Sequence, residues 1–191
     1  SLILENKVSQ SINLIKANKN KKNSDFFEAY ILLTLDYLRK NNINQAKEIL
    51  AKIPERYNQD RLNSVIIDSM VQYVDVFKNK KIPKEKKNLG SLSIISETFQ
   101  RCYLDDQITD SFFLTLINNG QADYSRYIFF YLTYLIEKNR IDEAKEITNE
   151  INYISTSLLL SQGKSWVERS QNKEFSKVFS CNNHNDIIGE L

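Results

Sequence analysis

The tripeptide Gly163-Lys164-Ser165 has the residue types that end a phosphate-binding loop, in which backbone amides, a lysine and a hydroxyl group hold a nucleotide. Such a loop also needs a glycine five residues before Gly163, where this chain has Leu158, and a β-strand in front of it. The leucine run that begins at Leu158 is typical of a helix instead. We therefore expect no nucleotide site here.

Ser161 and Lys164 form a second chemical pattern, because a lysine three residues after a serine can activate that serine as a nucleophile. The companion motifs of this class of serine enzymes are absent from the sequence. A serine hydrolase therefore remains only an alternative. We expect no enzymatic activity and no catalytic residues.

Cys181, His184 and Asp186 stand close together and carry side chains that ligate metals. Structural zinc sites use four ligands, and His184 is the single histidine of the chain. We therefore expect neither a metal site nor a cofactor. For Cys181 and Cys102 the simplest prediction is two buried thiols, and a disulfide between them is the alternative in an oxidising compartment.

Lysines cluster in two runs, residues 16–22 and 78–87, which could contact the phosphates of a nucleic acid. Glu85 interrupts the second run, and the net charge of +2 is far below that of most nucleic-acid-binding domains. Solvated loops are the better interpretation. A nucleic-acid-binding helical repeat, using Lys80, Lys81, Lys86 and Lys87, is kept as an alternative.

The composition favours an all-helical protein. The chain has 191 residues, of which 41% are hydrophobic, so it can bury a core. With only 4 glycines and 2 prolines, it lacks the residues that hairpins and glycine-rich loops require. No run approaches the ~20 consecutive apolar residues that span a bilayer, so we expect no membrane insertion.

Apolar residues recur at helical spacing along most of the chain. This spacing predicts helices over residues 2–16, 26–39, 43–53, 61–78, 92–103, 109–118, 124–138, 141–153 and 156–169, with a last helix after residue 185. In the helix over 61–78, the buried stripe is predicted to contain Leu62, Val65, Ile66, Met70, Tyr73, Val74 and Phe77. The lysine-rich segment 78–88 is predicted to be an exposed connection.

The segment Lys40-Asn-Asn-Ile-Asn-Gln-Ala-Lys-Glu-Ile49 returns 98 residues later as Lys138-Asn-Arg-Ile-Asp-Glu-Ala-Lys-Glu-Ile147. Each copy spans the turn after one predicted helix and the first part of the next, and with the helix before it describes a helix-turn-helix unit. Such a unit cannot bury its own apolar face, so it stacks on its neighbours in a solenoid. The offset is close to three repeats of ~34 residues, which predicts degenerate units between the two clear copies.

These units resemble tetratricopeptide repeats (TPRs). In the unit 25–53, Tyr30, Leu33, Tyr37, Ala46, Leu50 and Ile53 match the family's large, large, aromatic, small, large and small packing residues. In the unit 123–151, the matching residues are Ile128, Tyr131, Leu135, Ala144 and Ile151. Thr34 and Leu132 depart from the pattern, which has a small residue between the helices there. The resemblance implies a single TPR-like α-solenoid domain over residues 1–191.

The second half of the chain is also similar to poorly characterised TPR proteins of AT-rich alphaproteobacteria. The similarity rests on Arg101-Cys102-Tyr103, on the segment 124–130 and on Ser180-Cys181-Asn182-Asn183. It implies export, for example to the periplasm, with a cytoplasmic location as the alternative. The chain begins without a methionine and stops at Leu191 inside a helical pattern, so we expect a piece of a longer protein.

In TPR proteins the first helix of each unit lines a concave groove. The resemblance places Glu28, Ile31, Leu35, Leu38, Arg39, Arg126, Phe129, Thr133, Ile136 and Glu137 in that groove. Family members that clamp a terminal carboxylate have Lys, Arg and Asn at these positions, whereas Ile31, Leu35 and Phe129 stand here. We expect a protein-interaction scaffold whose groove takes an apolar or helical segment, either of an unidentified partner or of this protein's own further repeats.

Overall fold

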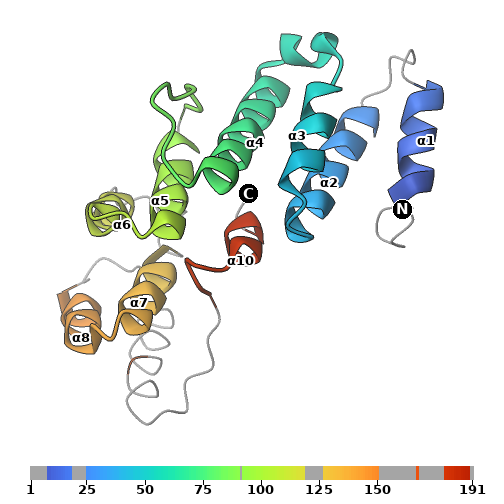
Figure 1. The fold of residues 1–191 in the computed structure, drawn as a ribbon. Coiled ribbons are helices and arrows are strands. Elements are labelled where there is room, and N and C mark those ends of the chain that lie inside the picture. Colours follow the sequence, from blue (N-terminus) through green and yellow to red (C-terminus); the bar gives the residue numbers. More distant parts are fainter. Residues whose placement is uncertain are drawn as a thin grey trace. The chain divides into compact units, whose positions relative to one another are not determined.

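The structure is a computed structural model that describes residues 8–18, 25–90, 92–118, 127–150, 167 and 179–189 (Figure 1). Within these ranges all regular structure is helical and there is no β-strand, which confirms the all-α prediction. The chain divides into two compact units, Ser1–Ser96 with Ile188–Leu191 and Glu97–Ile187. Each unit is described by itself.

The first unit is built from consecutive helices that pack on one another. They are α1 (Val8–Asn18), α2 (Asp25–Arg39), α3 (Ile43–Ala51), the short 3₁₀ helix η1 (Glu55–Gln59) and α4 (Arg61–Asn79). The helix α2 contacts α1, α3 and α4, so three neighbours surround it. Tyr30 and Leu33 of α2 form a buried apolar cluster with Ile15 of α1 and Ile49 of α3. Burying a side chain such as Leu33, which is 0% exposed, contributes about 1.5–3 kcal/mol.

Local signals explain where α3 and α4 begin. The side chain of Asn42 accepts a hydrogen bond from the Gln45 amide at 3.4 Å, and that of Asp60 accepts one from the Asn63 amide at 3.0 Å. Each bond satisfies an amide that has no partner inside the helix. Pro54 has extended backbone angles (φ −61°, ψ 136°), as expected for a residue that separates α3 from η1.

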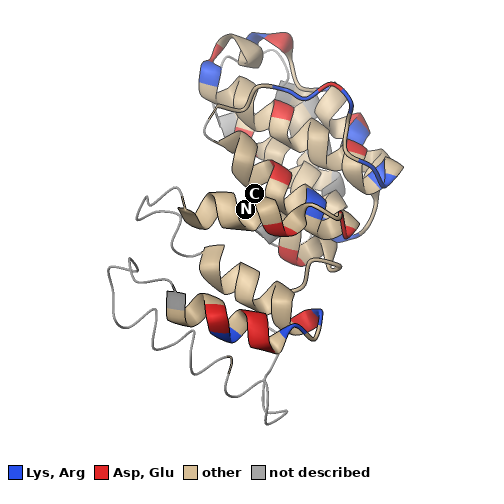
Figure 2. Cartoon of the chain, turned by 90° about the vertical axis from the view of Figure 1, so that its left-hand side faces the viewer, with Lys and Arg blue, Asp and Glu red and all other residues tan. Residues whose placement is uncertain are grey.

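The second unit contains the helices of the other clear repeat. The helix α5 (Leu92–Leu104) enters it from the first unit, followed by α6 (Thr109–Asn118), α7 (Tyr127–Glu137), α8 (Ile141–Glu150) and the start of α10 (His184–Gly189). The helix α7 packs against both α6 and α8. The sequence of α8 contains several acidic residues and a lysine, whereas Glu137 is the one charged residue of α7, and the colours of Figure 2 show this difference.

An aromatic cluster forms the centre of the second unit. Phe99 is 0% exposed, and its ring centroid lies 5.4–6.3 Å from those of Phe113, Tyr127, Phe130 and Phe179. Three of these pairs have edge-on geometry, which places ring hydrogens against a π face. Aromatic pairs of this kind contribute about 0.5–1.5 kcal/mol beyond burial.

Three helix ends share one turn geometry. Asn41, Asp105 and Asn139 have φ of 56°, 54° and 60°, in the left-handed region. In each case the backbone amide of the following residue donates a hydrogen bond to a carbonyl of the last helical turn. The bonds run from Asn42 to Tyr37 O (2.8 Å), from Asp106 to Arg101 O (3.0 Å) and from Arg140 to Leu135 O (2.8 Å). This pattern is a Schellman cap. It recurs at both copies of the sequence repeat and at the end of α5, 34 residues before Asn139.

Some expectations differ from the structure or lie beyond the described residues. Leu62 is 66% exposed, so its predicted burial is wrong, whereas Met70, Tyr73, Val74 and Phe77 are buried as predicted. The apolar stripe of α4 continues to Leu62, beyond the part of the helix that neighbouring elements cover. Of the predicted helix 156–169 the structure describes Val167 alone, which is helical, and the ends of the predicted helices over 2–16, 124–138 and 141–153 fall outside the described residues.

Candidate partner-binding faces

The outer face of α2 carries four of the predicted groove residues. Glu28, Ile31, Leu35 and Arg39 follow one another at spacings of three and four, so they form one stripe along the helix. Glu28 and Arg39 are exposed, and Ile31 and Leu35 are half-buried. Next to them Leu32 is 39% exposed. This face therefore offers apolar surface between a carboxylate and a guanidinium.

Leu38 belongs to the core and not to this face. Its side chain is 0% exposed, so it has no surface with which to contact a partner. Its carbonyl accepts the Asn41 amide at 2.9 Å within the turn that ends α2. The groove expected in the first unit therefore consists of the remaining four residues.

The corresponding face of α7 is more enclosed. Thr133 is 1% exposed, and its hydroxyl donates to the Phe129 carbonyl at 2.8 Å, so it cannot contact a partner. Phe129 and Ile136 are half-buried. Arg126 lies outside the described residues.

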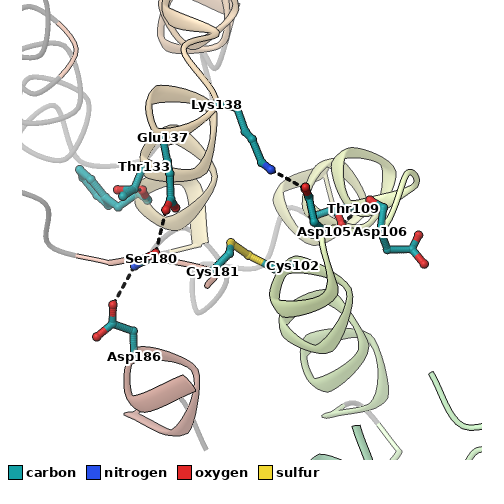
Figure 3. The surroundings of a disulfide bond; sticks show 11 residues. Cys102, Asp105, Asp106, Thr109, Thr133, Glu137, Lys138, Ser180, Cys181 and Asp186 are labelled. Carbon is teal, nitrogen blue, oxygen red and sulfur yellow. Dashed lines mark hydrogen bonds and ion pairs between the residues drawn. A yellow bond between two sulfur atoms is a disulfide. The ribbon is translucent and has the colours of Figure 1, made fainter. Parts of the chain in front are cut away.

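The chain's own residues occupy part of the α7 face. Ser180 donates its hydroxyl hydrogen to Glu137 Oε1 at 2.8 Å (Figure 3), and the Phe179 ring lies 4.7 Å from that of Phe130. The Ser180 amide in turn donates to Asp186 Oδ2 at 2.8 Å. Phe179 and Ser180 are 4% exposed each. This segment thus contacts Glu137, one of the predicted groove residues, and Phe130 on the same helix.

A disulfide fixes the same segment to α5. The structure joins Cys102 and Cys181, whose Cα atoms are 5.1 Å apart (Figure 3). The prediction of two buried free thiols is therefore wrong, although both residues are buried, at 1% and 2% exposure. The sequence offered no signal for the pairing, because their sequence separation is 79 and no spacing rule applies.

The grouping of Cys181, His184 and Asp186 does not form a metal site. The Cys181 sulfur is part of the disulfide, and Asp186 accepts hydrogen bonds from the Ser180 amide and from Asn183 Nδ2 (3.1 Å). Across the described part of the chain, no three His, Cys, Asp or Glu side chains are grouped so that they could hold a metal ion.

An ionic network around Asp110 was not anticipated from the sequence. Arg140 donates to both Asp110 oxygens, at 2.9 and 3.0 Å, and Tyr131 donates its hydroxyl hydrogen to Asp110 Oδ1 at 2.8 Å. Burial, followed by the bond to Asp110, raises the pKa of Tyr131 above its ordinary value of 10.0. Bonds to Glu143 and then to Asp110 raise the pKa of Arg140, and the bond to Arg140 lowers the pKa of Glu143.

One signal in the sequence does relate to this network. Arg140 occupies the repeat position of Asn42, which caps α3 in the first copy. In the second copy the Arg140 side chain instead joins Asp110 of α6 to Glu143 of α8.

The residues of the two catalytic patterns, Ser161, Gly163, Lys164 and Ser165, lie outside the described residues. Among the helices that the structure describes, none is both long and apolar enough to cross a membrane.

Comparison of the chain with protein-family models, with curated proteins and with solved structures finds no match.

Proposed function

We propose that the chain is a protein-interaction scaffold without chemistry of its own, built from TPR-like helix pairs. Its partner surface is the outer face of α2, formed by Glu28, Ile31, Leu35 and Arg39. The ligand is an apolar or helical segment of a partner protein. The observation that carries the proposal is the half-buried apolar stripe of Ile31 and Leu35 between two exposed charges.

Two observations support the TPR-like arrangement. Ala46 and Ala144, the small residues at equal positions of the two copies, are both 0% exposed, as required where helices pack closely. The Schellman caps at Asp105 and Asn139 are 34 residues apart, which equals the TPR period. The helix pair α5 and α6 is thus a candidate for one of the degenerate repeats.

Interface chemistry supports the choice of the α2 face. Partner sites combine an apolar centre with a polar rim, and helical segments dock through apolar residues at spacings of three and four. Ile31 and Leu35 supply such a centre, and Glu28 and Arg39 supply charges at its ends. On α7 the equivalent face is already contacted by Phe179 and Ser180.

The disulfide supports an exported location. Disulfides persist in oxidising compartments and are rare where thiols are kept reduced. A pair that is joined in the fold, as Cys102 and Cys181 are, therefore suits a protein that leaves the cytoplasm. The expected result is that Cys102 and Cys181, in protein isolated from its own cell and then denatured, resist thiol alkylation until a reductant is added.

Site-specific photocrosslinking tests the α2 face. A photoreactive phenylalanine analogue placed at Arg39, which is exposed, should crosslink a partner in cell extract, and the additional substitution Leu35→Glu should abolish that product. The matched control places the analogue at Leu114, which is 39% exposed on α6 in the other unit. Circular dichroism of each variant checks that the helices persist.

The two positions must behave differently for the proposal to hold. Identical crosslinked products from positions 39 and 114, or a product at position 39 that survives Leu35→Glu, would show that α2 is not the partner face. Mass spectrometry of a product specific to position 39 identifies the partner.

A further inference from the structure

The outer face of α2 carries a stripe of side chains that is symmetrical about the middle of the helix. Its members are Glu28, Leu32, Leu35 and Arg39. They follow one another at intervals of four, three and four residues, so they lie on one face. Glu28 and Arg39 are exposed, Leu32 is 39% exposed, and Leu35 is half-buried, with half-buried Ile31 beside it. Two leucines therefore stand at the centre of the stripe, with a carboxylate and a guanidinium at equal distances on either side.

Within the part of the chain that the structure describes, the two charges at the ends of this stripe have no ion-pair partner. Glu28 and Arg39 are too far apart to pair with each other, because eleven residues of helix span ~16 Å. By contrast, Asp36 of α2 and Lys40 just after the helix pair with each other at 3.0 Å. The two end charges of the stripe are therefore available to a second molecule.

A helix with this pattern is complementary to an antiparallel copy of itself. The midpoint between Glu28 and Arg39 is also the midpoint between Leu32 and Leu35. When two α2 helices lie antiparallel about a two-fold axis through that point, Glu28 of one copy is level with Arg39 of the other, and Leu32 with Leu35. Because the axis repeats each contact, the opposite charges meet at both ends and the leucines meet between them. A parallel arrangement would instead place like charges opposite one another.

The corresponding face of α7 does not offer an equivalent surface. The repeat position of Leu35 is Thr133, which is 1% exposed. The repeat position of Arg39 is Glu137, which accepts a hydrogen bond from the Ser180 hydroxyl at 2.8 Å. A contact between α2 of one copy and α7 of another would also join copies head to tail into larger assemblies, whereas a pair of α2 helices closes as a dimer. The observations therefore favour the symmetrical pair.

We propose that the partner of the α2 face is a second copy of this chain, bound through α2 in antiparallel orientation as a symmetrical dimer. The inference rests on the function proposed for α2, and it names the protein that α2 binds. One face of one helix is small beside the ~1,200–2,000 Å² of a standard interface, so the dimer dissociates in the micromolar range. The end charges fix the orientation of the two helices more than they add affinity.

Sedimentation velocity of the purified chain, at concentrations from about 1 to 500 µM, tests the pairing. The wild-type chain should change from monomer to dimer over this range. Leu32→Glu should weaken the dimer by roughly tenfold or more, because it places a carboxylate in the apolar centre of both copies. The matched control is Leu114→Glu on α6, which should have no effect, since Leu32 and Leu114 are both 39% exposed. Circular dichroism checks that each variant keeps its helices.

Charge reversals test the antiparallel orientation. Glu28→Arg alone gives the stripe two arginines, and Arg39→Glu alone gives it two glutamates. Each single variant should therefore dimerise roughly tenfold more weakly than the wild-type chain, and the difference should shrink at high salt. An equimolar mixture of the two single variants should form a heterodimer, because each stripe then meets one of opposite charge. The variant with both reversals should dimerise like the wild-type chain.

Four results would overturn the proposal. They are a wild-type chain that stays monomeric throughout the range, assembly beyond a dimer, association that Leu32→Glu leaves unchanged, and a mixture of the single charge variants that associates no better than either alone. The first result separates this inference from the function proposed for α2. A chain that is monomeric when purified, but whose position 39 crosslinks to a different protein in extract, keeps α2 as a partner face and loses the self-pairing.

Discussion

At the scale of single residues, Asn41 shows how the repeat ends its first helix. Its φ of 56° costs an ordinary residue about 1–2 kcal/mol, least for Asn and Gly and most for a β-branched side chain. We expect Asn41→Val to lower the free energy of unfolding by about 1–2 kcal/mol and Asn41→Gly to leave it equal or higher. Urea denaturation followed by circular dichroism measures both. Equal effects of valine and glycine would contradict a role for backbone conformation.

Tyr131 should make the stability of the second unit depend on pH in the alkaline range. Its pKa is raised in the folded state, so the phenol stays neutral there while the unfolded chain ionises above about pH 10. The unfolded state then releases protons first, and stability is lost as the pH rises from the unfolded pKa through the folded one. We expect Tyr131→Phe to make this loss less steep. Urea midpoints measured up to about pH 11 test it, and parallel curves for both proteins would refute it.

At the scale of helices, the tight contact between paired helices depends on a small residue. Ala46 and Ala144 are each 0% exposed, so a glutamate there would bury an unpaired charge. We expect Ala46→Glu or Ala144→Glu to destabilise the fold by about 3–5 kcal/mol. Ala51→Glu is the matched control, because Ala51 is exposed on the same helix as Ala46. If all three variants melt alike, the alanines do not mark helix contacts.

The same scale shows what the sequence could predict. Apolar spacing located α2, α4 and α6 to within a residue or two, because that spacing is a property of one helix. It misjudged Leu62, since periodicity tells which face is apolar and not how far a neighbour covers it. It also missed the link between Asp110 and Arg140, which depends on the packing of separate helices. The prediction that Leu38 and Thr133 line a groove is wrong for the same reason, because their burial depends on how separate helices pack.

At the scale of the whole chain, the contacts between the helices that the structure describes mostly join elements that are neighbours in sequence, and the disulfide is an exception. Cys102 and Cys181 close a loop with a sequence separation of 79, which restricts the unfolded state. In the chain-entropy account, opening a loop of this length costs about 4 kcal/mol. We therefore expect reduction to lower the stability of the second unit by about 2–4 kcal/mol, measured by urea denaturation with and without a dithiol reductant.

The effect of the cross-link on stability can be separated from the effect of packing the two sulfur atoms. Reduced wild-type protein keeps both sulfur atoms, whereas Cys102→Ala with Cys181→Ala also removes buried volume, so the variant should be less stable than the reduced protein. Because both cysteines are at most 2% exposed, the disulfide should resist the reductant in the native state and open only when the unit unfolds. Rapid reduction in native buffer, with no change in the urea midpoint, would show that the segment from Phe179 to Cys181 is not held by this bond.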